Sequence, residues 1–235
     1  MMKAAPVWVT MLFVASLAVN LWFAGSPQWT WIPAALAGWY LADLMSGLTH
    51  MYMDYRPCTP GIGLDRVFHY SGSRESDDYL ALRAAVMPRI SPFERLVYDF
   101  KNHHPRPDAL GRRSFLVQIG STILFVTLPA SILLNLLSLL VPVPGWLLAG
   151  AVIFIIGGTL AQYFHGTLHR ADNPWIVHAM RRVGLLMTPE AHALHHATLR
   201  RDFATNTGWS NPLVNVVFRA AIRGGWLNEA GLEPR

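Results

Sequence analysis

The sequence predicts an all-α integral membrane protein with four transmembrane helices, a cytoplasmic histidine-rich helical cap and further helices at the membrane surface. Hydrophobic residues make up 52% of the 235 residues and charged residues only 14%, well below the roughly 25% of soluble domains. The apolar residues gather in four membrane-length stretches, and basic residues are absent from the two short turns at 25–28 and 142–144. We treat residues 1–235 as a single domain, because the length fits one.

The four apolar stretches are long enough to cross a bilayer at about 1.5 Å of helical rise per residue. The spans are expected near residues 7–24, 29–53, 115–141 and 145–164. Short proline-containing links at 25–28 and 142–144 join them into two hairpins. The start of the chain also resembles a signal peptide, but its apolar run is longer than usual, so we expect a retained helix.

The basic residues set the expected topology. Lys3 precedes the first span, ten Lys and Arg residues lie between Arg56 and Arg113, and eight lie between Arg170 and Arg235. The positive-inside rule therefore puts both termini, segment 54–114 and segment 165–235 in the cytoplasm, with every histidine on that side. The net charge of +5 comes from basic residues that the topology places beside the membrane. We therefore expect no nucleic-acid partner.

Two cytoplasmic segments, 92–100 and 212–227, mix apolar and charged residues as helices in the headgroup layer do. Packing against the protein's own core is the alternative for both. The single cysteine, Cys58, excludes an internal disulfide and a thiolate-rich metal site.

Eight of the ten histidines fall into four tight groups near the ends of the apolar stretches. These groups are His50 with Asp54, His103 with His104, His165 with His169, and His192 with His195 and His196. Neutral imidazole is the commonest protein metal ligand, and one zinc needs only three or four protein ligands. Eight clustered histidines therefore indicate a centre with more than one ion, at the membrane boundary.

Helical spacing supports a shared site. Residues four apart lie on one helix face, which applies to His165 with His169 and to the His50–Asp54 pair. The three histidines of 192–196 have spacing that aligns their rings along one face. The adjacent histidines at 103–104 cannot share a face, but they could reach two ions from a helix end.

Several residues keep two interpretations. Asp54 either ligates a metal or hydrogen-bonds a ligating ring. Asp43 lies about two turns before His50 and is a candidate catalytic residue, although it could simply cap or pair with a neighbour. His69 and His178 stand alone and are expected to be ordinary interfacial histidines.

The ordered motifs resemble those of a known family. They are Ala42-Asp43-Leu44-Met45-Ser46-Gly47-Leu48-Thr49-His50-x-x-x-Asp54, Phe100-x-x-His103-His104-x-x-Pro107, His165-x-x-x-His169, His192-x-x-His195-His196 and Thr207-Gly208-Trp209-x-Asn211-Pro212. Together they are similar to the lipid desaturases called Kua or CarF-like, a group that includes plasmanylethanolamine desaturase and the plastid palmitoyl-phosphatidylglycerol desaturase. The resemblance extends from Trp39 to Leu213.

This resemblance implies two iron ions, O2 as co-substrate and electrons from a separate ferredoxin- or cytochrome b5-like donor. It implies nine metal ligands, namely His50, Asp54, His103, His104, His165, His169, His192, His195 and His196. The implied substrate is a membrane phospholipid, whose alkyl chain becomes a vinyl ether or whose acyl chain is desaturated. Two departures from the family's motifs bear on whether its substrate can be assigned to this chain. Met51 stands where a Trp often follows the first histidine, and the 52 residues between His50 and His103 are more than usual.

Other functions remain open at this stage. A lipid hydroxylase could use the same metal centre, and histidines at span ends could bind haem in a membrane electron carrier. A metal transporter predicts polar residues across the bilayer, which the last two spans largely lack. Arg106, Arg112 and Arg113 could hold a phosphate headgroup, or simply enforce topology. The sequence does not set the oligomeric state.

Overall fold

The structure, a computed structural model, describes residues 6–235, and within that range it is helical throughout with no strand. Lys3, used above for topology, lies outside the described residues. The elements are α1 (Val7–Ala24), α2 (Trp31–Tyr55), α3 (Leu64–Phe68), α4 (Asp77–Val86), a 3-10 turn (Met87–Arg89), α5 (Pro92–His103), α6 (Asp108–Gly111), α7 (Phe115–Thr122), a π turn (Ile123–Thr127), α8 (Leu128–Leu140), α9 (Gly145–Leu168), α10 (Trp175–Arg182), α11 (Pro189–Thr198), α12 (Asn211–Arg223) and a 3-10 turn (Glu229–Gly231).

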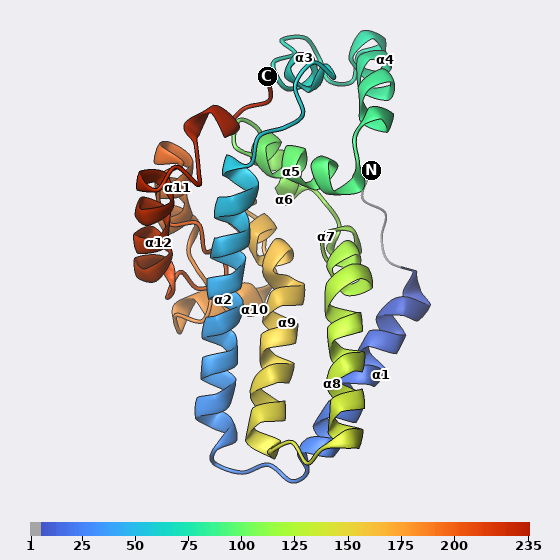
Figure 1. Ribbon diagram of the computed structural model, residues 1–235, viewed down its shortest axis with the longest axis vertical. Coiled ribbons are helices and arrows are strands. Elements are labelled where there is room, and N and C mark those ends of the chain that lie inside the picture. The colour runs from blue at the N-terminus through green and yellow to red at the C-terminus, as the bar shows by residue number, and fades with distance from the viewer. Residues whose placement is uncertain (1–5) are drawn as a thin grey trace.

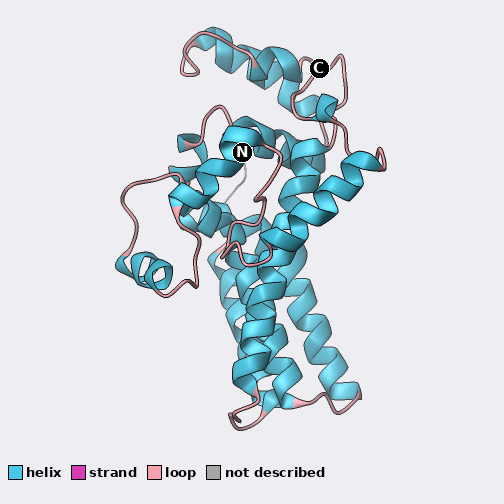
Figure 2. Cartoon of the chain, turned by 90° about the vertical axis from the view of Figure 1, so that its left-hand side faces the viewer, coloured by secondary structure: helices cyan, strands magenta, loops and turns pink. Residues whose placement is uncertain are grey.

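The long helices stand side by side, and the shorter ones gather around one end of them (Figures 1 and 2). The turns between α1 and α2 and between α8 and α9 both lie at the opposite end, at the bottom of Figure 1. The two expected hairpins are therefore present, and both turns lie at the end of the bundle away from the short helices.

Three helices are long and apolar enough to cross a membrane: α1, the α7–α8 rod over Phe115–Leu140, and α9. They match three of the four expected spans, with α9 continuing to Leu168. The fourth expected span is not confirmed by this criterion, although α2 has 25 residues. The reason is composition, since the second half of α2 carries Asp43, His50 and Asp54.

Helices α2 and α9 approach each other closely at small residues. A Cβ added at Gly38 would collide with the carbonyl of Gly150, and one at Gly157 would lie 2.6 Å from the Cβ of Ala42. Small residues at such interfaces let helix backbones come together. This contact brings His50 of α2 level with His165 of α9, with ring centroids 4.9 Å apart.

Helices α1 and α8 are joined by polar side chains within apolar surroundings. The hydroxyls of Ser16 and Ser131 lie 2.7 Å apart, and the Asn20 amide donates to Ser131 Oγ at 2.9 Å. Asn135 in turn donates to Ser16 Oγ at 2.9 Å. Interhelical hydrogen bonds of this kind hold membrane helices together.

The two expected surface helices form, but their environments differ. Helix α5 begins at Ser91, whose hydroxyl accepts from the amide of Glu94 at 3.1 Å, and it buries Val97 and Tyr98 in a core shared with α3 and α4. Helix α12 packs Phe218 against Tyr55 of α2 and leaves other apolar residues exposed. Packing against the protein's own core therefore accounts for α5, whereas α12 also keeps an apolar face outside.

Candidate metal centre

All nine side chains proposed as ligands come together at the capped end of α2 and α9. They form two groups, and within each group the candidate ligand atoms all lie within 4.8 Å of one another. The five-histidine group consists of His103, His165, His169, His192 and His196, and the carboxylate group consists of His50, Asp54, His104 and His195. Both groups are largely buried.

The two pairs of adjacent histidines are each divided between the groups. His103, the last residue of α5, belongs to the five-histidine group, whereas His104 belongs to the carboxylate group. On α11, His196 joins the former and His195 the latter. A helix end thus directs neighbouring rings to two places, as expected for 103–104. The three rings of α11 were expected to lie along one face. They are instead divided, because His192 and His196 belong to the five-histidine group and His195 belongs to the carboxylate group.

The five-histidine group places imidazole nitrogens around a common point. His192 Nε2 lies 3.1 Å from both His165 Nε2 and His196 Nε2. Nitrogens about 2.0–2.1 Å from one ion and at right angles would lie about 3 Å apart, so the observed spacing fits shared metal ligation. The Nε2 atoms of His103 and His169 are buried without a hydrogen-bond partner within residues 6–235.

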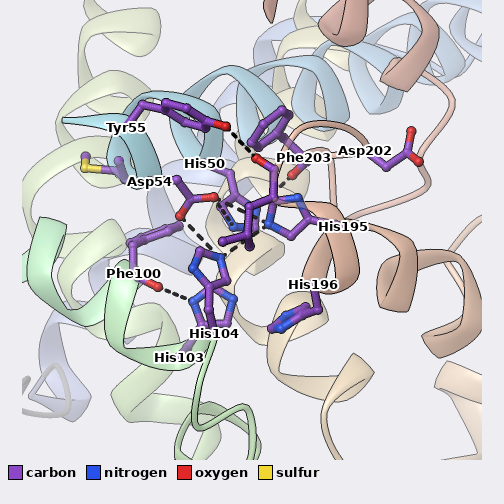
Figure 3. Close-up of polar contacts among 12 residues, drawn as sticks. His50, Asp54, Tyr55, Phe100, His103, His104, His195, His196, Asp202 and Phe203 are labelled. Atoms are coloured by element: carbon purple, nitrogen blue, oxygen red, sulfur yellow. Dashed lines mark hydrogen bonds and ion pairs between the residues drawn. The ribbon is translucent and has the colours of Figure 1, made fainter. Parts of the chain in front are cut away.

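The carboxylate group is built around Asp54, which points toward three imidazole rings (Figure 3). Its Oδ2 lies 3.3 Å from His50 Nε2 and 3.4 Å from His195 Nε2. Its Oδ1 lies 3.5 Å from His104 Nε2. Neither oxygen has a hydrogen-bond partner among the described residues. A fully buried carboxylate whose oxygens face three imidazole nitrogens is a site for a cation.

The segment 199–203 orients rings of the carboxylate group through backbone carbonyls. His50 Nδ1 donates to the carbonyl of Phe203 at 2.9 Å (Figure 3). His195 Nδ1 donates to the carbonyl of Arg201, also at 2.9 Å. Each bond leaves Nε2 to face Asp54, as in metal sites whose rings are fixed by outer hydrogen bonds. Leu199 and Asp202 adopt left-handed backbone angles, with φ of 53° and 59°. The sequence contained no periodic signal for this segment.

Asp43 occupies a different position. Its Oδ1 accepts from the amides of Thr207 and Gly208 at 2.8 and 3.0 Å, and its Oδ2 accepts from the amide and hydroxyl of Ser210 at 2.9 and 2.7 Å. Asp43 is fully buried and belongs to neither group of ligands. The structure therefore gives Asp43 the structural task of holding the motif that follows the last histidines, which is the pairing alternative raised above.

Lys101 is a site residue that the sequence reasoning missed. Its ammonium is fully buried and donates to the carbonyls of Met53 at 3.0 Å and of Asp54. It thus fixes the end of α2 directly behind the Asp54 side chain. Burial lowers the pKa of Lys101 to about 8. Only the fold brings α5 against the end of α2, so spacing along the chain could not have identified it.

Burial also keeps four of the rings outside the spans neutral, those of His103, His169, His192 and His196. It lowers the pKa of His169 to about 4 and that of His196 to about 3, and it holds those of His103 and His192 well below the usual range. Neighbouring histidines add to the effect in each case. Metal ions bind the neutral ring, so these groups are ready to ligate at neutral pH.

The two isolated histidines do not join the site. His69 is about half exposed, with its Nε2 3.6 Å from a carboxylate oxygen of Glu233, and His178 is exposed on α10. Both therefore occupy the ordinary surface environments expected for them.

These features define the class of the protein: an all-helical chain with membrane-length helices and two buried groups of metal-ligating side chains. The chain belongs to the lipid desaturase family, whose domain matches residues 86–222. That match includes seven of the nine ligand candidates and leaves out His50 and Asp54. The family resemblance drawn from the motifs is thereby confirmed.

The chain is also similar to the plasmanylethanolamine desaturase of Myxococcus xanthus. The two are 28% identical over 214 residues, covering 86% of this chain and 63% of the relative. The chain thus spans less than two thirds of the length of that relative. No solved structure matches it.

Proposed function

We propose that this protein is an O2-dependent desaturase that introduces a double bond into the hydrocarbon chain of a membrane phospholipid, with two iron ions as cofactor. The observation that carries the proposal is the convergence of two separate groups of buried candidate metal ligands at one end of the membrane helices. Family membership supplies the reaction class.

The donor set fits iron. Imidazole and carboxylate ligands suit non-haem iron, and the site lacks the thiolates that close structural zinc sites, since Cys58 is the one cysteine. Iron with O2 supplies the oxidising power needed to remove hydrogen from an unactivated C–H bond, which protein side chains cannot provide. The unpartnered oxygens of Asp54 and nitrogens of His103 and His169 are the atoms expected to hold it.

The protein's own residues supply position and environment. The carbonyls of Arg201 and Phe203 fix the rings of His195 and His50, so the ligands need little rearrangement. Asp54 contributes a negative charge that balances bound cations in a buried place. Burial of both groups keeps water away from the metal centre, where it would compete with the lipid chain for reaction with the oxidant.

Placement in the membrane follows from the same geometry. We propose that α2 crosses the bilayer with the three apolar helices, because it lies against α9 and its first half carries exposed apolar residues such as Ile32 and Leu36. The positive-inside rule then assigns both termini and the metal centre to the cytoplasm. A separate ferredoxin- or cytochrome b5-like carrier delivers electrons from that side.

For the substrate, an alkyl ether phospholipid that becomes a vinyl ether is the leading version. The similarity to a plasmanylethanolamine desaturase supports it. An acyl chain is the nearest alternative. A hydroxylase is the alternative reaction, because both reactions can begin by removing the same hydrogen. Haem is less suitable, because the imidazole rings, with centroids 4.2–6.2 Å apart, fill the space a porphyrin would need.

The test is lipid mass spectrometry on cells that express the protein, paired with metal analysis of the purified chain. We expect loss of two hydrogens from an alkyl or acyl chain with the active chain, none with His195→Ala, and wild-type conversion with the matched surface variant His178→Ala. Iron-loaded protein that leaves all lipids unchanged, given O2 and a working electron donor, would reject the proposal. A product that gains oxygen instead would assign the hydroxylase, and a strong Soret band would assign haem.

A further inference from the structure

A cavity of about 510 Å³ opens beside the five-histidine group. It lies where α6, the start of α7 and the end of α9 meet, and its lining includes Arg112, Arg113, Arg170 and His169. Its volume falls within the roughly 300–1,000 Å³ of small-ligand sites. The metal centre as described uses only His169 from this lining.

The arginines of the cavity are arranged to accept an anion. Arg112 makes no side-chain hydrogen bond or ion pair within residues 6–235. Arg170 is held in place by neutral groups, donating to Asn173 Oδ1 at 2.9 Å and to the Tyr163 hydroxyl at 3.1 Å. Its charge therefore has no carboxylate partner in the described part of the chain. Arg113 differs, because it pairs with Asp99 at 3.2 Å.

The structure also separates these arginines from Arg106, another residue considered above for a headgroup. Arg106 donates to the carbonyl of Phe68 and to Asn102 Oδ1, both at 2.8 Å, and it does not line the cavity. Its guanidinium is used to hold the cap together. A headgroup contact is thus assigned to the cavity arginines alone.

The level of the cavity indicates what kind of anion it meets. Arg112 and Arg113 immediately precede the apolar rod that begins at Phe115, and Arg170 follows the end of α9 at Leu168. Two spans thus meet water at this cavity, where phosphates of a bilayer lie. The first turn of α7 also starts here, after Ser114, and helix N-termini favour anions.

The cavity is directly connected to the metal centre by backbone contact. A Cβ at Gly111 would lie 2.6 Å from the carbonyl oxygen of His169, so α6 and the end of α9 are fixed against each other. His169 itself lines the cavity and contributes to the five-histidine group. A headgroup held here would lie next to His169, one of the ligands of the five-histidine group.

We propose that this cavity binds the phosphate of a phospholipid headgroup, with Arg112 and Arg170 as its main contacts. This rests on the proposed function, since it makes the bound lipid the substrate. Two carboxylates, those of Asp108 and Asp172, also line the cavity. A headgroup that carries an ammonium beside its phosphate would match both signs of charge, so phosphatidylethanolamine is the lipid to test. A free phosphate ion shares the arginine chemistry and is the other source to distinguish.

The experiment measures binding directly by calorimetry, with the full chain in a phosphate-free maltoside detergent. The probes are short-chain phosphatidylethanolamine and, separately, inorganic phosphate. The test variant is the double substitution Arg112→Gln/Arg170→Gln, and the matched control is Arg219→Gln, which removes an exposed charge from α12. We expect the double variant to bind the lipid at least about tenfold more weakly, the control to bind normally, and both to retain their metal content.

Two outcomes overturn the proposal. Unchanged lipid affinity in the double variant rejects the site, and weakened binding of inorganic phosphate alone assigns the cavity to the free ion. The fate of the proposed function is separate. A chain that binds lipid through these arginines but desaturates nothing keeps the headgroup site and loses the enzymatic assignment. A chain that desaturates lipids, but whose double variant binds lipid with unchanged affinity, keeps the enzymatic assignment and loses the headgroup site.

Discussion

The two ligand groups lie side by side, yet they are built differently. The five-histidine group has only neutral ligands and reaches the cavity through His169. The carboxylate group contains a fully buried Asp54, and two of its rings are fixed by carbonyls of segment 199–203. The comparison teaches that one group is charged and has two rings fixed by a distant segment, whereas the other is uncharged and has one ring, that of His103, fixed by the carbonyl of Phe100.

This difference predicts unequal behaviour toward metal. A buried carboxylate attracts a cation more strongly than neutral rings do, and preorganised ligands lose less entropy on binding. We therefore expect the carboxylate group to hold its ion more tightly. The five-histidine group, which is next to the substrate cavity, is expected to exchange its ion more readily.

The largest expected effect comes from Asp54→Asn. It should weaken metal binding at its group about a hundredfold or more, because it removes the only charge there while keeping the shape. His169→Gln should weaken the other group about tenfold. Metal stoichiometry during competition with a chelator measures both, with His178→Gln as the control. Equal losses in the two variants would contradict the comparison.

The next effect concerns Lys101, whose ammonium bonds to the backbone carbonyls of Met53 and Asp54 beside the carboxylate group. Lys101→Met leaves two buried carbonyls without a donor, at a cost of about 1–3 kcal/mol each. We expect this variant to have a lower thermal unfolding midpoint. We also expect it to lose the ion of the carboxylate group before that of the five-histidine group. Arg219→Met, on the exposed face of α12, serves as the control. An unchanged midpoint would show that water replaces the ammonium without penalty.

A third effect is a pH dependence of the metal-free protein. His169 and His196 stay neutral in the fold down to pKa values of about 4 and 3, whereas unfolded histidines bind protons near pH 6.5. Between pH 6.5 and about 4 the unfolded chain therefore binds more protons, and the free energy of unfolding decreases as the pH falls.

Chemical denaturation of metal-free protein at pH 7 and pH 5 measures this decrease. The double variant His169→Gln/His196→Gln should show a flatter dependence over the same range. A variant as steep as the parent would place the responsible groups elsewhere. Adding metal should steepen the dependence, because protons then compete with the ion for the rings.

The smallest expected effect tests the orienting segment. Asn215 Oδ1 accepts from the Asp202 amide at 2.9 Å, and Asn215 Nδ2 donates to Asp202 Oδ1 at 3.0 Å. These two bonds support the left-handed backbone of Asp202. Asn215→Ala should speed metal loss from the carboxylate group by a few-fold and leave the other group unchanged, since outer-layer changes act weakly at a distance. Leu213→Ala, on the exposed side of the same helix, provides the control. A change in both groups would mean general loosening.

Helical periodicity was enough to predict much of this site. Spacing of four residues correctly paired His165 with His169 and His50 with Asp54, and three of the four expected spans and the two hairpin turns followed from hydropathy. What it could not predict depends on contacts between distant segments. The Lys101 ammonium and the carbonyl of Phe203 meet α2 only after the cap has folded.

Some predictions also depended on properties that sequence patterns do not record. Asp43 has the appearance of an intramembrane functional carboxylate, but its oxygens are taken up by the amides of Thr207 and Gly208 and by Ser210. The α11 rings are divided because His195 lies against Asp54 of α2, whereas His192 and His196 lie against the two histidines at the end of α9. Neither could be inferred from one helix considered alone.

The division of adjacent histidines has a consequence for how the ions are acquired. His103 and His104 are joined by one peptide bond, as are His195 and His196, yet each pair serves both groups. Immobilising one ring of a pair restricts the backbone of the other, so the first ion reduces the entropy lost when the second arrives. The two ions should therefore load in order, the carboxylate group first, and its occupancy should raise the affinity of the five-histidine group for the second ion.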